Sequence, residues 1–278
     1  MTLEEIVPYV RSKMGLLYPR ALLAVAALLV SACGGGLDTA GSSPPASTLK
    51  SSEPAEDIGE QRSALAYAEA VVVTPSSGDA CTGVLVAPRV VLTAAHCVVF
   101  SRGSFEVTAP FSLGGPQTTT ASSAEPMDAA WKNLRADDYA GRGLRDVAAV
   151  YLDRPFTHVL YATLAPAAFD ASTTSPPIWV SAVGKSAGGP EGSLSLSLTG
   201  ALGEPSGDAI TYTTTRLSAL GEAGGPLFVE GTHDLVALYT GIDDAAKRDV
   251  WARLDGDVYT WITQKVAGHG GWHTRTPK

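Results

Sequence analysis

The chain has 278 residues, of which 45% are apolar and 17% charged, and its formal net charge is −8. This length allows one large all-β domain or two small ones, and the apolar content is enough for a hydrophobic core. No basic run or stripe is present, so we expect no nucleic-acid partner.

The N-terminal segment has the pattern of an export signal. The apolar run at 21–30 has about the length of a signal-peptide core and is too short to span a membrane. It ends in Val-Ser-Ala-Cys at 30–33, which resembles a bacterial lipoprotein signal, where the peptide is cut before a cysteine that is then lipidated. We therefore predict a lipoprotein signal peptide at 1–32 and lipidation of Cys33.

The N-terminal segment also indicates where translation starts and where the protein is located. Glu4 and Glu5 are atypical of such a signal, whereas a start at Met14 would be conventional. Gly34 is not the aspartate associated with inner-membrane retention. We expect an exported lipoprotein, held in the outer membrane or at the cell surface by a lipid on Cys33, or else a secreted or periplasmic protein.

The three cysteines of the chain agree with this prediction. An odd number in an exported protein leaves one thiol to explain. Lipidation of Cys33 leaves Cys81 and Cys97 as an even pair for a disulfide in an oxidising compartment. The alternative is a free thiol at Cys33.

Two changes of composition define the domain organisation. Residues 33–62 are rich in Gly, Ser and Pro and predict a flexible tether, followed by a folded domain at 63–266. Short β-type runs broken by turns fill that domain and suggest a sandwich or barrels. The predicted strands are 69–74, 83–87, 90–93, 104–108, 147–152, 178–183, 193–199, 209–214, 226–229 and 235–240.

The end of the domain has helical spacing. Val258, Trp261, Ile262 and Val266 fall on one face of a predicted helix at 256–266. The remaining residues, 267–278, are expected to form a disordered tail.

Three separate motifs contain the residue types of nucleophilic catalysis. Thr-Ala-Ala-His-Cys at 93–97 follows two predicted strands and contains His96. Asp146 opens an apolar run, where a carboxylate has no packing reason to be. Gly-Glu-Ala-Gly-Gly-Pro at 221–226 contains glycines that let the backbone turn tightly and direct amide groups into a pocket.

The histidine and the aspartate also have simpler interpretations. His96 is otherwise a buried core histidine, and Asp146 a turn aspartate at a strand start. A histidine base needs a carboxylate that orients it, and Asp137, Asp138 and Asp153 compete for that role. None of the three opens an apolar run.

Together the motifs resemble the trypsin-like serine peptidases (S1 family, chymotrypsin fold), whose nucleophile loop reads Gly-Asp-Ser-Gly-Gly-Pro. The resemblance covers roughly 66–266, with weak stretches at 100–140 and 155–205. It implies an all-β fold of two six-stranded antiparallel β-barrels with a C-terminal α-helix.

The resemblance also implies roles for individual residues. Cys81 and Cys97 would form a disulfide that holds the loop of His96, the general base, and Asp146 would be its orienting carboxylate. The backbone N–H groups of Gly221 and Ala223 would form the oxyanion hole. Leu217, Thr240 and Gly241 would lie at the specificity pocket, where an apolar Leu217 argues against a preference for Lys or Arg.

The chain departs from the family at the nucleophile. Ala223 stands where the serine should be, and Glu222 replaces the aspartate that pairs with a newly made N-terminal amine. No Ile-Val-Gly-Gly-like sequence precedes Val71. We therefore expect a pseudoenzyme without hydrolase activity, whose cleft binds a peptide or protein segment.

Two other hypotheses stay open. The chain is an active serine endopeptidase with a non-standard nucleophile, for which Ser218 and Thr240 are candidates, or it is a purely structural scaffold. We expect no cofactor and no metal, because the other histidines lack metal-ligand spacing. These are His158, His233, His269 and His273.

Overall fold

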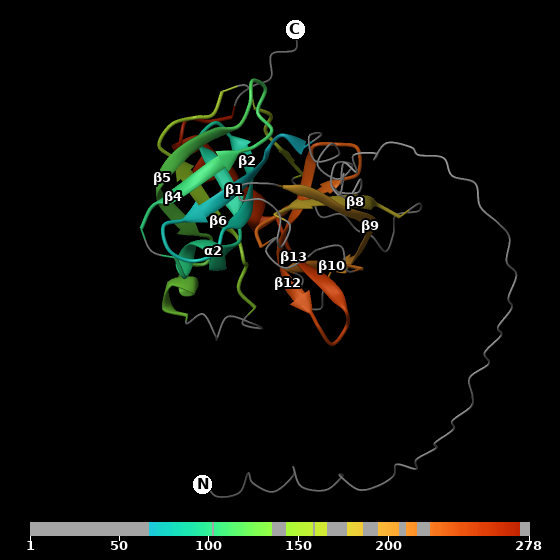
Figure 1. Cartoon of the computed structure of the whole chain (residues 1–278). Coiled ribbons are helices and arrows are strands. Elements are labelled where there is room, and N and C mark those ends of the chain that lie inside the picture. Colours follow the sequence, from blue (N-terminus) through green and yellow to red (C-terminus); the bar gives the residue numbers. More distant parts are fainter. Residues whose placement is uncertain are drawn as a thin grey trace, which may run out of the picture. The chain divides into compact units, whose positions relative to one another are not determined.

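The computed structural model describes residues 67–101, 103–134, 143–157, 159–165, 177–185, 194–205, 210–215 and 223–272. These residues form two β-barrels that lie side by side (Figure 1), which confirms the predicted fold class. No helix in the described part of the chain is both long and apolar enough to cross a membrane.

The first barrel is a closed ring of six antiparallel strands in the order β1-β2-β3-β6-β5-β4. Its strands are β1 (Ala70–Pro75), β2 (Cys81–Ala87), β3 (Val90–Thr93), β4 (Phe105–Ala109), β5 (Gln117–Pro126) and β6 (Ala148–Leu152). A five-residue helix, α2 (Ala95–Val99), follows β3, and a 3-10 helix, η2 (Ala129–Asn133), follows β5.

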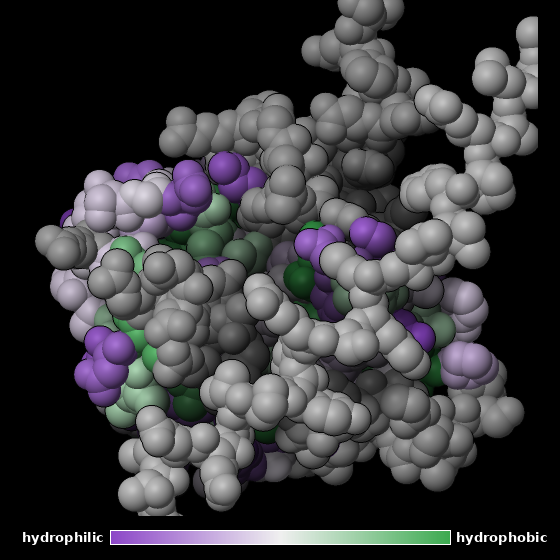
Figure 2. Space-filling model, turned by 90° about the horizontal axis from the view of Figure 1, so that it is seen from below, coloured by the Kyte–Doolittle hydropathy of each residue, from purple (hydrophilic) through white to green (hydrophobic). Residues whose placement is uncertain are grey.

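Strands β1 to β3 are mostly apolar, and nearly all of their residues are buried on both faces. Successive side chains of a strand point to opposite faces. Val71 and Val73 belong to the core inside the first barrel, whereas Val72 belongs to a second core shared with the other barrel and the C-terminal helix. On the face drawn in Figure 2, hydrophobic and hydrophilic residues alternate over short distances.

The second barrel is a ring of six antiparallel strands closed by the pairing of β11 with both β8 and β12. Its strands are β8 (Trp179–Gly184), β9 (Ser195–Pro205), β10 (Thr211–Thr215), β11 (Pro226–Val229), β12 (Asp234–Asp243) and β13 (Arg248–Arg253). A two-residue strand, β7 (Thr163–Leu164), lies between the barrels in sequence and pairs in parallel with β12.

The sequence did not predict β5, β7 and β13. Strand β5 is rich in Thr and Ser, and only two of its ten residues are buried, so it carries little hydrophobic signal. Strand β13 is Arg-Asp-Val-Trp-Ala-Arg, with polar residues at both ends. Its strand conformation depends on pairing with β10 on one side and β12 on the other.

The C-terminal helix α3 (Asp257–Gly268) is close to its predicted position. Val258, Ile262 and Val266 are its buried residues, four positions apart, and they join the core shared by the two barrels. The helix also contacts β5, where the Lys265 ammonium lies 2.8 Å from both carboxylate oxygens of Glu125. Hydrogen bonding to Lys265 lowers the pKa of Glu125, against the effect of burial.

The helix extends into the segment that the sequence assigned to a disordered tail. It ends at Gly268, and the ring of His269 stacks on Tyr151 with centroids 3.7 Å apart. The backbone N–H of Gly271 donates to the Val266 carbonyl at 2.9 Å. Packing against the first barrel therefore orders 267–272, and the rest of the predicted tail lies outside the described residues.

Candidate active site

His96 lies on the short helix α2, directly after β3. Cys97, its neighbour, forms a disulfide with Cys81, the first residue of β2, so the helix is covalently tied to the barrel. The disulfide predicted for these two cysteines is therefore present. Its effect is to limit how far the backbone of His96 can move.

Asp146 meets His96 because of how two strands pair. In the antiparallel pair of β3 and β6, Thr93 lies opposite Ala148, so the end of β3 and the start of β6 are at the same edge. His96 comes three residues after Thr93, and Asp146 two residues before Ala148. Strand pairing thus brings together two residues that are 50 positions apart.

The contact between the two side chains is close and partly shielded from water. Oδ2 of Asp146 lies 2.7 Å from Nδ1 of His96, and its Oδ1 accepts the backbone N–H of His96 at 3.0 Å. The side chains are 8% and 16% exposed, respectively. Because a carboxylate oxygen accepts hydrogen bonds, this contact pairs Asp146 with the tautomer of His96 that has its proton on Nδ1 and a lone pair on Nε2. This is the arrangement that a histidine general base requires.

Ala223 lies beside the disulfide that supports His96. Its side chain packs against Cys81, Ala94 and Cys97, and its carbonyl accepts the backbone N–H of Thr82 at 2.8 Å. The predicted nucleophile position is therefore next to the histidine loop. A methyl group has no lone pair, so position 223 itself supplies no nucleophile.

Gly224 allows this close approach. Its φ is +77°, a conformation that residues with a Cβ rarely adopt. A Cβ at this position would also collide with Thr93 and Thr82, and would lie 2.8 Å from the backbone nitrogen of Ala94. The glycine-rich loop of the second barrel therefore docks directly on the strands that precede His96.

The other predicted site residues are described only in part. Thr240 and Gly241 lie on β12, where the Thr240 hydroxyl donates to the carbonyl of Val250 at 3.3 Å. Among the residues that the structure describes, no atom lies within 4 Å of a Cβ built on Gly241. Gly221, Leu217 and Cys33 lie outside the described residues, and so does Ser218.

The cluster around His96 is not arranged as a metal site. The sulfur atoms of Cys81 and Cys97 and a ring nitrogen of His96 lie within 4.8 Å of one another. The two sulfurs are bonded to each other, however, and a metal ligand must be a thiolate. The residues fit a disulfide beside a histidine base.

A second histidine–carboxylate pair was missed by the sequence analysis. Nδ1 of His233 lies 2.6 Å from Oε1 of Glu69, whose side chain is fully buried. The pair joins the segment before β1 to the turn before β12, and the ring of Tyr67 stacks on Phe228 beside it. The two partners are 164 residues apart, so no local pattern could have indicated the contact.

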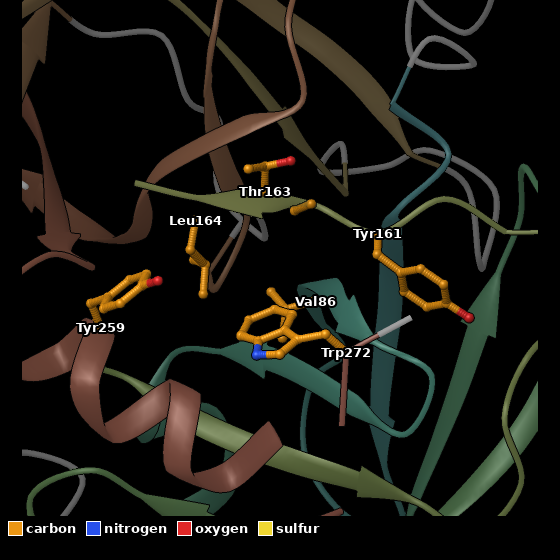
Figure 3. A pocket seen from close by; sticks show the side chains of 7 residues that line it. Val86, Tyr161, Thr163, Leu164, Tyr259 and Trp272 are labelled. Atoms are coloured by element: carbon orange, nitrogen blue, oxygen red, sulfur yellow. The ribbon is translucent and has the colours of Figure 1, made fainter. Parts of the chain in front are cut away.

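A separate pocket lies between the first barrel and the C-terminal helix (Figure 3). It measures about 330 Å³ and is lined by Val86, Tyr161, Ala162, Thr163, Leu164, Tyr259 and Trp272. None of the predicted catalytic positions lines it. Burial raises the pKa of Tyr161.

The fold defines a class of protein. Two six-stranded antiparallel barrels followed by a C-terminal helix form the trypsin-like serine peptidase fold. The model of the trypsin family matches residues 58–262. This range is well over half of the chain, and the chain therefore belongs to the trypsin family.

Solved structures agree on the fold. That of HL collagenase has a TM-score of 0.56 and 17% identity, over 72% of this chain and 94% of its own. That of Glu endopeptidase in complex with MPD has a TM-score of 0.57 and 16% identity, over 72% of this chain and 91% of its own. No curated protein matches the sequence significantly.

The docking of the glycine-rich loop predicts an unequal response to two alanine substitutions. Gly224 and Gly231 both have positive φ, but within the described residues a built Cβ meets other atoms only at Gly224. Gly231→Ala should lower the free energy of unfolding by about 1 kcal/mol, the cost of the left-handed backbone. Gly224→Ala should lower it by about 1–3 kcal/mol more, because overpacking adds to that cost.

Urea denaturation of the two variants and the parent measures this difference. Equal losses in both variants would contradict the tight docking of residues 223–225 on the first barrel.

Proposed function

We propose that this chain is a trypsin-family homologue that does not hydrolyse peptide bonds and that binds a peptide or protein segment in the family's substrate cleft. One observation carries the proposal. The histidine–carboxylate pair has the geometry of a general base, whereas the adjacent position 223, where the family has its nucleophile, is an alanine.

The loss of turnover expected without a catalytic serine supports the absence of peptide hydrolysis. In subtilisin, loss of the catalytic serine lowers turnover about a millionfold. The oxyanion hole and substrate binding alone leave an acceleration of about 10³–10⁴ over water. A chain limited to that residual rate would not serve as a practical peptidase.

The alternative is an active endopeptidase with another nucleophile. Thr240 is the described candidate, but its hydroxyl donates to the carbonyl of Val250 on β13. A nucleophile must instead share a hydrogen bond with the base. This observation favours the inactive homologue.

A fluorophosphonate probe separates the two functions. The probe bonds phosphorus to an activated serine oxygen with loss of fluoride, while the serine proton passes to the histidine base. We expect no labelling of the parent chain and clear labelling of Ala223→Ser. The same variant with His96→Gln is the matched control and should not label.

Labelling of the parent would show another nucleophile and overturn the inactive assignment. If Ala223→Ser also fails to label, restoring the serine oxygen is not enough to restore reactivity. The part of the proposal that then fails is the claim that the histidine–carboxylate pair is an intact general base.

Binding in the cleft has its own test. No atom of the described part of the chain lies within 4 Å of a Cβ built on Gly241, and this supports room for a bound segment beside β12. We expect the parent to raise the fluorescence anisotropy of dye-labelled casein. Gly241→Trp should bind at least about tenfold more weakly, because the indole would take the place of part of the bound segment, and the loss of one strong interface contact costs at least this much.

Gly268→Trp is the matched control. A Cβ built on Gly268 also has no atom of the described segments within 4 Å, but Gly268 lies at the end of α3. Equal binding by the two tryptophan variants, or no binding by the parent, would argue against a peptide in the cleft.

We further propose that the chain is an exported lipoprotein held at the membrane by Cys33. The apolar run before Val-Ser-Ala-Cys supports this. In a bacterial host fed labelled palmitate, the parent should carry the label and sediment with membranes, whereas Cys33→Ser should lose the label. A Cys33→Ser variant that remains labelled would exclude this cysteine as the anchor.

A further inference from the structure

Trp131, on the 3-10 helix η2, lies between the two elements that hold the histidine–carboxylate pair. Its side chain is only 2% exposed. Its indole Nε1–H donates to the carbonyl of Arg145, the residue before Asp146, at 2.9 Å. One aromatic side chain is therefore bonded to the backbone next to the carboxylate.

The same ring also reaches the histidine helix. It packs edge-on against Phe100, with ring centroids 6.2 Å apart and planes inclined by 63°. Phe100 caps α2, and its backbone N–H donates to the carbonyl of His96 at 3.4 Å. Trp131 therefore contacts both the end of the helix that carries the base and the chain that carries its partner.

Neighbours of Trp131 hold the backbone on both sides of Asp146. Oδ2 of Asp128 accepts the backbone N–H of Arg145 at 2.7 Å. The backbone N–H of Met127 donates to the carbonyl of Val147 at 2.8 Å. The residues before and after the carboxylate are thus both bound by one short segment, 127–131.

We propose that Trp131 and Asp128 are positioning residues, which set the contact between Nδ1 of His96 and Oδ2 of Asp146. The inference rests on the proposed function only in taking His96 as the base of the family's site. The physical reason is that the 2.7 Å contact tolerates little displacement, because hydrogen bonds weaken steeply with length and angle. A shift of the Arg145–Asp146 backbone moves the carboxylate directly.

A variant that keeps an aromatic ring at position 131 but removes its N–H donor tests the positioning role separately from packing. Trp131→Phe retains an aromatic side chain against Phe100 but cannot bond the Arg145 carbonyl. The matched control is Trp251→Phe, which removes an equally buried indole N–H from its 2.9 Å bond to Thr214 in the second barrel. Both variants lose one internal hydrogen bond, but only the first loses it near Asp146.

The first readout is the NMR signal of the Nδ1 proton of His96 in the full-length parent, assigned by its loss in His96→Gln. A proton shared with a carboxylate resonates far downfield and exchanges slowly with water. We expect exchange at least about tenfold faster in Trp131→Phe, and no change in Trp251→Phe. A signal equal in both variants would overturn the proposal.

The second readout uses Ala223→Ser as the background and measures the rate of fluorophosphonate labelling. A small misplacement of catalytic groups can cost up to about 100-fold in rate. We therefore expect labelling to slow by about 10- to 100-fold with Trp131→Phe and to change less than about twofold with Trp251→Phe. Equal slowing in both would show a general loss of stability instead of positioning.

Asp128 keeps the proposal testable if Trp131→Phe does not fold. Asp128→Ala removes the acceptor for the Arg145 N–H and should speed proton exchange, whereas Asp128→Asn retains an acceptor oxygen and should restore slow exchange. If the Nδ1 proton exchanges as slowly in Asp128→Ala as in the parent, Asp128 does not position the carboxylate. The NMR readout needs no reactive serine, so its result is independent of whether the parent hydrolyses or binds peptides.

Discussion

Thr82 is the point at which the two barrels are hydrogen-bonded beside the candidate active site. This buried residue of β2 donates its backbone N–H to the carbonyl of Ala223 and accepts the backbone N–H of Lys185 on its hydroxyl oxygen. Its own carbonyl accepts the hydroxyl of Thr93, at the end of β3. Because Ala223 and Lys185 belong to the second barrel, the position of the glycine-rich loop relative to α2 depends on these bonds. The loop reaches them only because Gly224 has no Cβ.

The parts of this site differ in what they do for the protein. The disulfide and the docking of Gly224 hold the fold together, so their presence is expected whether or not the chain catalyses a reaction. The pair of His96 and Asp146 is different, because two polar side chains that are partly shielded from water contribute little packing. The structure therefore places a hydrogen-bonded histidine–carboxylate pair at the loop that the disulfide ties to the barrel, with the methyl group of Ala223 packed against that disulfide.

The chain contains two histidine–carboxylate pairs with similar contact distances and different surroundings. The pair of His96 and Asp146 lies within the first barrel, at the common edge of β3 and β6, where segment 127–131 holds the backbone beside the carboxylate. The pair of His233 and Glu69 connects the two barrels, and its carboxylate is fully buried. The two pairs thus have similar contact distances, and they differ in which elements they join and in how deeply the carboxylate is buried.

Much of the fold could be predicted from the sequence, since its signals are local. The apolar runs of β1 to β3 and the four-residue spacing of Val258, Ile262 and Val266 in α3 identify their elements without reference to the rest of the chain. Strand β5 could not be found in this way, because its Thr- and Ser-rich surface is mostly exposed and its backbone bonds to β4 and β6 make it a strand.

For the site, the sequence by itself determined which side chains are available: a histidine, a carboxylate that opens an apolar strand, a pair of cysteines and an alanine at the position predicted for the nucleophile. These are properties of single residues and their neighbours. Only the tertiary structure decided which of them meet, and it added Trp131 and the pair of Glu69 and His233. Such contacts depend on which strands pair and on how two barrels pack, and these are long-range interactions that leave no mark on the sequence around either partner.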